Sequence, residues 1–358
     1  MPWDDVVFDL TFVHGIILLT GVILYATLGG ADFGGGIWDL FASGPRAERQ
    51  RQEIARAIGP IWEANHVWLI FVVVLTFTIY PPVFAAISSA LYVPLSLILV
   101  GITLRGGAFV FRAYASDVAP ARIGLSRVFA AASVVTPMLL GMCAGAVATG
   151  DIRVIDGDVT SSLWTTWLSP FPIVIGLLAL TVCAYLAAVY LCVETTGDLR
   201  EDFRTRALIT GAVFTALSIA ALPLTRSQAP VIWDGMLDRE IVTIVPLAIL
   251  TAVASGIAVL KRRFGLARVA AVAWVAMIIV GWALAQYPYL VVPDLTVTNA
   301  AASRAMLVVA LWTYIVGAIV LIPALWYLFA LFKGKNPAAT GAYGASTGEL
   351  HTGEEHSA

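Results

Sequence analysis

Long apolar runs separated by short polar stretches make up most of the chain. A helix that crosses a bilayer needs roughly 20 mostly apolar residues. Nine runs reach or approach this length, and they cover residues 7–28, 59–80, 84–104, 128–149, 170–192, 207–224, 241–260, 269–287 and 305–330. The sixth run is the shortest, and Pro81 and Pro82 separate the second run from the third because proline interrupts a helix. The pattern predicts an all-α polytopic membrane protein with nine transmembrane helices.

The positive charges predict how the chain is oriented. Of its 21 Lys and Arg residues, 17 lie in the odd-numbered loops or in the C-terminal tail. The even-numbered loops hold the other four, which are Arg153, Arg226, Arg239 and Arg304. Cytoplasmic loops carry an excess of Lys and Arg, so we expect the N-terminus outside and the C-terminus inside. This orientation requires an odd number of spans, as the nine runs provide.

Composition supports a membrane protein and indicates no water-soluble domain. The chain of 358 residues is 60% hydrophobic and 12% charged, whereas soluble domains are about 25% charged. Residues 1–333 are expected to form one membrane domain, in which 38–56 is a cytoplasmic helical segment. Residues 334–358 are low in apolar side chains and are expected to form a disordered cytoplasmic tail. The net charge of −2 gives no indication of a nucleic-acid partner.

The stretch from Ile58 to Ile70 is unusually polar for the start of a membrane helix. It contains the carboxylate of Glu63, the amide of Asn65 and the imidazole of His66. Ionisable groups near the bilayer centre cost roughly 2.5–3.5 kcal/mol each, so their presence indicates a use. The Gly-Pro pair at 59–60 suits a helix start, because proline is favoured at the first helical position.

Within this stretch, Glu63 is the candidate for proton transfer. It falls in the first predicted turn, where the helix dipole favours an anion, about one turn inside the cytoplasmic boundary. His66 follows three residues later on the same helix face, and Trp62 lies alongside. A partly buried carboxylate at this depth can take a proton from the cytoplasm and pass it inward. A helix-capping carboxylate that is hydrogen-bonded to a neighbour is the alternative.

A glycine-rich segment, residues 28–36, surrounds Asp32 at the inner end of the first run. Its glycines allow either a close helix approach or a backbone turn. Asp32 is expected at the membrane depth of Glu63, so the two acids can share a water chain; alternatively, Asp32 caps a helix junction. Arg105 and Arg112 end the third run. They can pair with either acid, with an acidic lipid or with a haem propionate, or can be ordinary positive-inside residues.

The histidine count argues against haem ligands on this chain. His14 and His66 are the two histidines in apolar runs, whereas His351 and His356 lie in the tail. A dihaem cytochrome needs four axial ligands, so the chain is not expected to bind haem by itself. His14 is interpreted as a hydrogen-bonded polar side chain. The three cysteines lie in apolar runs without a Cys/His pattern and are interpreted as small buried hydrophobes, so no metal site is predicted.

Taken together, these motifs resemble subunit II of the cytochrome bd-type quinol oxidases, in the branch of cyanide-insensitive oxidases. The resemblance covers about residues 5 to 333. Its most specific element is the string Gly-Pro-x-Trp-acid-x-Asn-x-x-Trp-Leu. The segments that carry it, in family order and spacing, are Gly30–Gly34, Gly59–Leu69, Tyr92–Leu95, Leu104–Arg112 and Tyr287–Tyr289.

Two departures from the family pattern affect the acids. Many members carry an acid at the position of Gly29, so here Asp32 alone remains of that pair. Many also carry Asp where this chain has Glu63, and Glu or Gln where it has His66. The carboxylate function is kept with one more methylene, while the histidine makes the proton route of this chain differ from that of many members.

The resemblance implies an architecture of two four-helix bundles plus a peripheral ninth helix in the bacterial cytoplasmic membrane. It implies a heterodimer with a similarly folded subunit I, which binds all the haems (b-type, with or without haem d) and the quinol. It leaves open whether a small single-span subunit joins them. The chain itself binds no cofactor; it stabilises subunit I and lines proton and oxygen access, in contact with lipids and quinone.

Three functional hypotheses remain. In the first, the complex oxidises quinol electrogenically and reduces O₂ to water with protons from the cytoplasm. Asp32 and Glu63 then form the entry of a proton path that Trp62, Asn65 and His66 shape, and no catalytic residue lies on this chain. The second is a proton-coupled secondary transporter that uses the same acids, although no internal repeat is evident. The third is a purely structural subunit that its partner needs for assembly.

Overall fold

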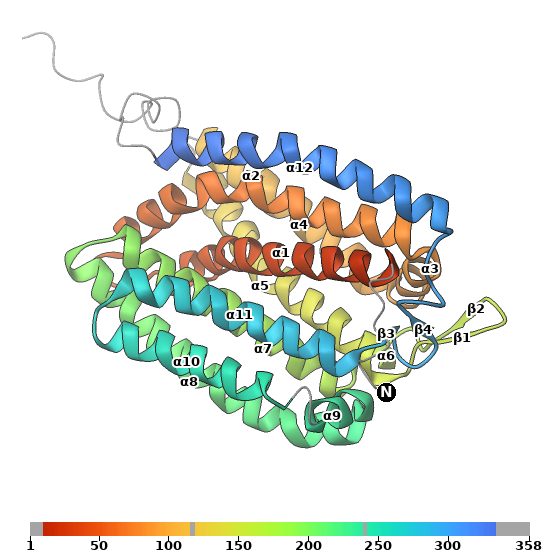
Figure 1. Ribbon diagram of the computed structural model, residues 1–358. Helices are drawn as coiled ribbons and strands as arrows, with labels where there is room; N and C mark the ends of the chain where they lie inside the picture. The colour runs from red at the N-terminus through yellow and green to blue at the C-terminus, as the bar shows by residue number, and fades with distance from the viewer. Residues whose placement is uncertain (1–9, 115–118, 239–241, 334–358) are drawn as a thin grey trace, which may run out of the picture.

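The structure, a computed structural model, describes residues 10–114, 119–238 and 242–333 (Figure 1). The side chains of 58–64, 112–114, 119–123 and 328–333 are not among those it describes. The expectations for the acidic N-terminus and for the tail at 334–358 therefore lie outside the described residues.

Long helices form nearly all of the described structure. The helices are α1 (Leu10–Leu40), α2 (Ala47–Ile79), α3 (Pro81–Ala90), α4 (Tyr92–Tyr114), α5 (Ala119–Thr149), α6 (Thr165–Leu168), α7 (Pro170–Glu194), α8 (Gly197–Gln228), α9 (Pro230–Leu237), α10 (Ile244–Leu260), α11 (Phe264–Gln286) and α12 (Arg304–Lys333). Two antiparallel hairpins pair β1 (Arg153–Ile155) with β2 (Asp158–Thr160) and β3 (Tyr289–Val291) with β4 (Leu295–Thr296). Both hairpins lie at the same end of the molecule (Figure 1).

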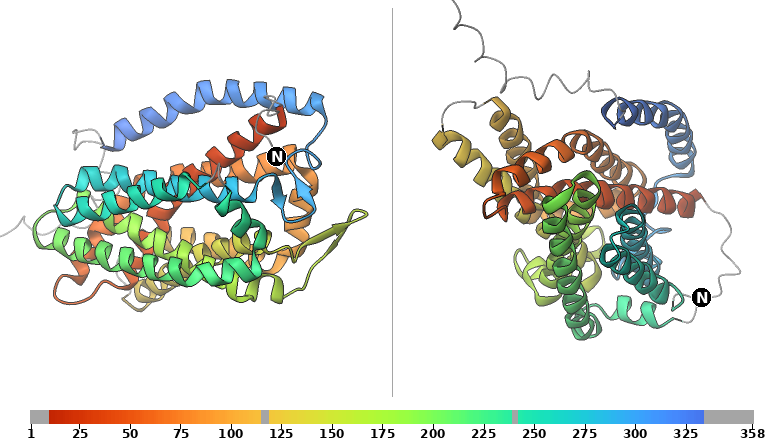
Figure 2. Two further views of the ribbon diagram at one scale, coloured as in Figure 1. Left: turned by 60° about the horizontal axis from the view of Figure 1, so that its bottom comes forward. Right: turned by 90° about the vertical axis from the view of Figure 1, so that its left-hand side faces the viewer.

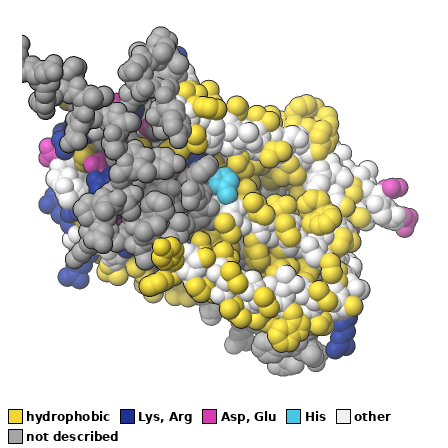
Figure 3. Space-filling model, turned by 90° about the horizontal axis from the view of Figure 1, so that it is seen from above, with side chains coloured by type: hydrophobic (Ala, Val, Ile, Leu, Met, Phe, Trp, Pro, Cys, Tyr) yellow, Lys and Arg dark blue, Asp and Glu magenta, His cyan; other side chains and the backbone are white. Residues whose placement is uncertain are grey.

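The helices have the length and composition of membrane spans. Among the described residues, seven helices are long and apolar enough to cross a bilayer, or eight if the bent pair α2–α3 counts as one span. Helix α10 is apolar but has 17 residues, so it is shorter than these seven helices. Charged side chains gather at the two ends of the molecule, and a broad apolar surface lies between them (Figure 3). The chain is therefore an all-α polytopic membrane protein.

Helix α1 lies at the centre of the packing. It contacts α2, α5 and α7, while α4 packs on α5, α8 on α7, and α10 on α11 (Figures 1 and 2). Helix α12 runs along one side of the molecule, against α1 and α2 (Figure 2). Most of its described side chains are exposed. We call residues 10–149 the first half and residues 170–286 the second half of the membrane domain.

The glycine-rich segment lets α1 approach its neighbours closely without interrupting the helix. The helix was expected to end near residue 28, but it continues through the glycines to Leu40. A Cβ atom at Gly34 would overlap the carbonyl of Cys183 on α7, and one at Gly36 would overlap Ser133 on α5. The alternatives of a backbone turn or a helix junction at this point were wrong, because the missing side chains serve helix packing instead.

Helix α2 corrects the predicted helix start at residues 59–60. The helix begins at Ala47 and runs to Ile79, so the Gly-Pro pair lies inside it. The segment 38–56, which was expected to be helical, contains the end of α1 and the first turns of α2, with residues 41–46 between them. Glu63 consequently lies about four turns into the helix, beyond the reach of the N-terminal dipole that was expected to favour its charge.

Two other spans differ from their predictions. The chain bends by 116° between α2 and α3, as expected for a break before Pro81 and Pro82. The run 84–104 is not one helix, however, because it is divided at Leu91 between α3 and α4. The run 207–224 was expected to be the weakest span, yet it lies within α8, a helix of 32 residues.

Polar side chains join the two halves at the end of the molecule where α1 ends and α2 and α8 begin. Arg46 donates two hydrogen bonds to the carboxylate of Asp202, at 2.9 and 2.7 Å. Gln50 donates to the same carboxylate at 2.9 Å and accepts a bond from Arg206 at 2.8 Å. These contacts hold the first turn of α2 against α8.

Candidate functional site

A buried ion pair is the main polar feature inside the first half. Asp32 on α1 is fully buried and Arg105 on α4 is 2% exposed. The guanidinium donates from Nη1 to Asp32 Oδ2 and from Nη2 to Asp32 Oδ1, both at 2.7 Å. A third bond, at 2.9 Å, joins Nη2 to the main-chain oxygen of Asp32. This two-pronged geometry is the strongest that a carboxylate and an arginine adopt.

The remaining surface of the guanidinium is also covered. Arg105 Nε donates to the hydroxyl of Ser133 on α5 at 2.9 Å, and that hydroxyl donates to the carbonyl of Phe129. The rings of Phe33 and Phe129 lie 5.0 and 4.9 Å from the guanidinium carbon, within the range of cation–π attraction. The charge of Arg105 is therefore balanced inside the protein, although the positive-inside count treated this residue as part of a loop.

Asn65 connects helix α2 to the ion pair. Its side-chain nitrogen lies 3.4 Å from Asp32 Oδ2, and the residue is 2% exposed. A Cβ atom at Gly29 would lie 2.7 Å from the Asn65 side-chain oxygen. The absence of a side chain at position 29 thus makes room for the approach of Asn65.

His66 does not join this inward cluster. It is partly exposed and begins a row of outward-facing apolar residues on α2 that continues with Ile70, Val74 and Phe77, which are 62%, 52% and 61% exposed. The side chains of the other proposed proton-path residues on α2, Trp62 and Glu63, lie outside the described ones, as does that of Arg112 on α4. The structure therefore brings together Asp32, Asn65 and Arg105 from the predicted set.

His14 lies far from this cluster, near the start of α1. It is fully buried; its Nδ1 lies 2.6 Å from the carbonyl oxygen of Leu10, and its ring packs edge-on against Tyr314 of α12. Nε2 has no hydrogen-bond partner within the described part of the chain. The interpretation of His14 as a hydrogen-bonded residue thus holds for one of its two ring nitrogens.

The two intramembrane histidines do not fit the axial sites of one haem. The contact between Asp32 and Asn65 shows that this part of α1 lies beside the part of α2 that carries His66. His14 lies 18 residues before Asp32 on the same continuous helix. At 1.5 Å per residue, His14 and His66 are separated by about 27 Å along the helix axis.

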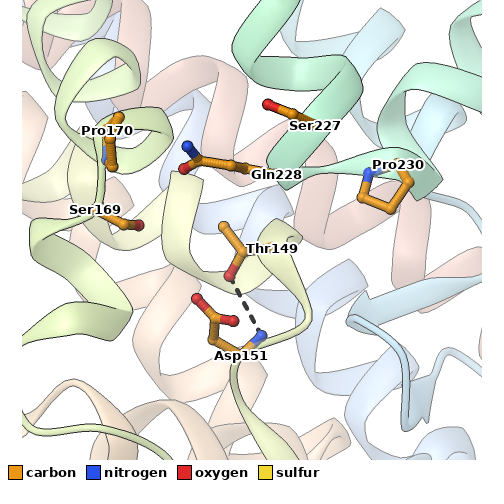
Figure 4. Close-up of a pocket in the computed structure, with 7 residues that line it drawn as sticks. All are labelled: Thr149, Asp151, Ser169, Pro170, Ser227, Gln228 and Pro230. Atoms are coloured by element: carbon orange, nitrogen blue, oxygen red, sulfur yellow. Dashed lines mark hydrogen bonds between the residues drawn. The ribbon is translucent and has the colours of Figure 1, made fainter.

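A polar pocket of about 470 Å³ lies elsewhere, at the end of α5 (Figure 4). Its lining includes Thr149, Asp151, Ser169 and Gln228, and the Asp151 main-chain nitrogen donates to the Thr149 hydroxyl at 3.3 Å. Thr149 is 16 residues from Ser133 on α5, so the pocket lies about 24 Å from the ion pair. It does not belong to the same site.

A second ion pair lies at the hairpin end of the molecule, outside the helices. Arg153 donates to both carboxylate oxygens of Asp294, at 2.9 and 3.1 Å, and the main-chain nitrogen of Val154 donates to the same carboxylate. The Arg153 guanidinium holds the pKa of Asp294 below its ordinary value. This pair fastens the hairpin β1–β2 to the segment before β4.

Sequence reasoning missed the residues of α5 that complete the ion pair. Ser133 and Phe129 lie inside an apolar run that carries no charge between residues 128 and 149. A serine three positions before a threonine-proline pair was the available signal, but hydroxyls in membrane helices usually bond to their own helix. Only the packing of α4 on α5 shows that Ser133 accepts from Arg105.

Comparisons with known proteins give matches over most of the chain. Residues 10–332 match the family model for cytochrome bd terminal oxidase subunit II. A putative cytochrome bd menaquinol oxidase subunit II from Bacillus subtilis (strain 168) is 25% identical over 324 residues, which are 87% of this chain and 92% of that protein. Cytochrome bd-I ubiquinol oxidase subunit 2 from Escherichia coli (strain K12) is 29% identical over 57% of this chain and 54% of its own length.

A solved structure has the same fold. The bd oxidase from Geobacillus thermodenitrificans contains a chain that superposes with a TM-score of 0.76 and 22% sequence identity, over 91% of this chain and 99% of that one. At this identity the likeness shows the fold, and the match extends over nearly the whole membrane domain.

Proposed function

This chain belongs to the cytochrome bd terminal oxidase subunit II family and is a subunit of a bd-type quinol oxidase, and from this premise we propose how it works. The match over residues 10–332 is the observation that carries the assignment. We propose that the chain pairs with a subunit I that binds the haems and the quinol. In that complex it serves as the haem-free half, in the bacterial cytoplasmic membrane.

The architecture of the proposed subunit has nine spans. Seven helices would be spans by themselves, the bent pair α2–α3 would be the eighth, and α10, with 17 residues, would be the ninth and shortest. The first and second halves would each supply four spans, and α12 would be the peripheral ninth helix. The excess of Lys and Arg in the odd-numbered loops supports an outer N-terminus and an inner C-terminus.

The ion pair would have a structural role in the proton route. Both oxygens of Asp32 accept hydrogen bonds from Arg105, so this carboxylate is engaged in the pair. Glu63 is then the acid that takes protons from the cytoplasm, with Trp62 and His66 beside it and Asn65 linking α2 to the pair. The fixed charges of the pair would keep this part of α2 in place.

The proposed function is tested by purifying the complex from native membranes through an affinity tag on this chain. A haem-bearing partner should co-purify, and the reduced-minus-oxidised spectrum should show its b-type haems. The complex should consume oxygen when quinol is added. If the chain purifies folded without a haem protein and moves protons in liposomes together with a solute, it is a transporter and the assignment is wrong.

A further inference from the structure

Several buried polar atoms surround the Asp32–Arg105 pair without a protein partner. Within the residues that the structure describes, the Tyr25 hydroxyl, the Asn65 side-chain oxygen and the Thr136 hydroxyl accept or donate no hydrogen bond. They come from three different helices, α1, α2 and α5. Buried polar groups in native proteins are paired with protein or with ordered water, so three such atoms in one region require an explanation.

Thr136 lies one turn from the ion pair along the contact between α4 and α5. Arg105 on α4 meets Ser133 on α5, and the next pair of facing residues is Gly101 and Thr136. A Cβ atom at Gly101 would overlap the Thr136 hydroxyl, so this hydroxyl packs directly against the glycine. Pro137 follows within α5 and has no N–H, which removes the helical donor to the Ser133 carbonyl.

The hydroxyl of Thr136 also behaves unlike most helical threonines of this chain. Threonine side chains in membrane helices commonly donate to the carbonyl four residues earlier in their own helix. Thr27 on α1, Thr181 on α7 and Thr251 on α10 do so at 2.8 to 3.1 Å. Thr136 is fully buried, and no such bond is formed. Its hydroxyl is therefore available to another group.

Tyr25 and Asn65 approach the pair from the other helices. Tyr25 is seven residues before Asp32 on α1, on the same face of the helix, and its hydroxyl is buried. Asn65 uses its nitrogen toward Asp32, which leaves its oxygen next to Gly29. Donors and acceptors thus flank the pair on both sides.

We propose that ordered water binds to these unpartnered groups beside Asp32–Arg105, held by Thr136 and the Ser133 carbonyl on one flank and by Tyr25 and Asn65 on the other. A buried water molecule typically makes about three hydrogen bonds, and these groups supply acceptors and donors of that number. The water keeps the ion pair hydrated within the helix bundle. This next step rests on the function proposed above. In the oxidase, the water offers protons a path past the ion pair while the salt bridge between Asp32 and Arg105 stays intact.

The test compares the thermal stability of the purified complex with and without the flanking hydroxyls. Thr136→Val and Tyr25→Phe keep the volume of each side chain and remove its oxygen. If water is bound there, each variant loses a hydrogen-bonded partner, and the melting temperature falls by about 2 °C. Thr27→Val is the matched control, because the Thr27 hydroxyl is bonded within its own helix, and its melting temperature should stay within about 1 °C of the native value.

A cryo-EM map of the complex at a resolution that shows ordered water provides the second readout. Density is expected about 3 Å from the Thr136 and Tyr25 oxygens. The proposal is overturned if the two variants raise the melting temperature, since replacing an unpaired polar atom by an apolar one in a dry site is stabilising. It is also overturned if a protein side chain occupies these positions in the map. Neither readout depends on quinol oxidation, so failure here leaves the proposed function untouched.

Discussion

The two halves of the membrane domain are both bundles of apolar helices, but they bury different polar groups. The first half encloses the charged pair Asp32–Arg105. Among the described residues of the second half, the central polar contact is neutral: the hydroxyls of Tyr185 and Ser255 lie 2.7 Å apart, and Ser255 donates to the carbonyl of Ala267. Desolvating a charged pair costs several kcal/mol per ion before attraction offsets it, whereas hydroxyl contacts avoid that cost.

The difference indicates where the chemistry of this subunit lies. The second half obtains its packing from aromatic contacts, with Trp274 at 5.2 Å from Tyr185 and 4.6 Å from Phe214, measured between ring centroids. It shows that the fold can be built without a buried charge. The first half keeps a buried charged pair, Asp32–Arg105, next to the α2 segment that carries Glu63. This ion pair is therefore a candidate for a role in the function of the subunit as well as in its packing.

The largest effect should come from breaking the ion pair. Arg105→Leu leaves the carboxylate of Asp32 buried without a partner, which is expected to destabilise the complex by about 3–5 kcal/mol. Tyr185→Phe is the matched change in the second half, and removing its single neutral bond should cost about 1 kcal/mol. Chemical denaturation of the purified complexes, followed by tryptophan fluorescence, measures both.

The double variant Asp32→Leu with Arg105→Leu sharpens this result. Because it removes both charges, we expect it to be more stable than Arg105→Leu alone. If the single and double variants are equally stable, or if Tyr185→Phe is as damaging as Arg105→Leu, the contrast between the halves is not one of charge.

A second prediction concerns the glycines. Gly34→Ala places a Cβ atom against the carbonyl of Cys183, where α1 of the first half meets α7 of the second, and should cost about 1–3 kcal/mol. Gly256→Ala on α10 is the control, since a Cβ atom there has open space around it. That substitution should be neutral or stabilise by up to about 1 kcal/mol. Equal thermal stability of the two variants would contradict the role given to the α1–α7 contact.

A third prediction separates proton transfer from structure within the first half. Glu63→Gln should lower quinol-dependent oxygen consumption by about tenfold or more, because it removes a group that gains and loses protons. The melting temperature and haem spectrum should stay unchanged, and Glu63→Asp should restore most of the turnover. Native turnover in Glu63→Gln would remove this residue from the mechanism and favour a purely structural subunit.

The smallest effect is expected at the hairpin end. Asp294→Asn weakens the pair with Arg153, whose side chain is 48% exposed, so the loss at neutral pH should be about 0.5 kcal/mol or less. The pKa of Asp294 is lowered in the folded protein from its ordinary value of 3.8. The contribution of the pair is therefore present above about pH 3.8 and fades as the pH falls through the folded pKa. A loss that grows on acidification would contradict this assignment; melting curves at several pH values test it.

The sequence predicted the class of fold and most of the spans because apolar length is a strong signal in membrane proteins. The prediction of helix boundaries failed where a residue type can either end a helix or lie inside one. The Gly-Pro pair at 59–60 was interpreted as a helix start, but it lies inside α2. For the glycines of 28–36, a close helix approach and a backbone turn were both left open, and the packing of α1 against α7 and α5 shows the close approach. The local propensity of glycine does not show which neighbouring helix packs against the position that lacks a side chain.

The site was predicted in part for a similar reason. Asp32 and Arg105 were identified as candidates, but the sequence left four possible partners for the arginine. Choosing among them requires the relative rotation of α1, α4 and α5, which no single helix determines. The grouping of His66 with Glu63 by spacing stays a prediction, because the Glu63 side chain is outside the described ones, whereas the neighbouring Asn65 is found facing Asp32.

The central claim is that this chain is the haem-free half of the oxidase, and its two intramembrane histidines provide the most direct test. The measurement is the reduced-minus-oxidised spectrum, with haem content per complex, of the double variant His14→Gln with His66→Gln purified in complex with its partner. The account predicts every haem band and the haem content of the native complex. The loss or shift of any haem band would place an axial ligand on this chain and contradict the account.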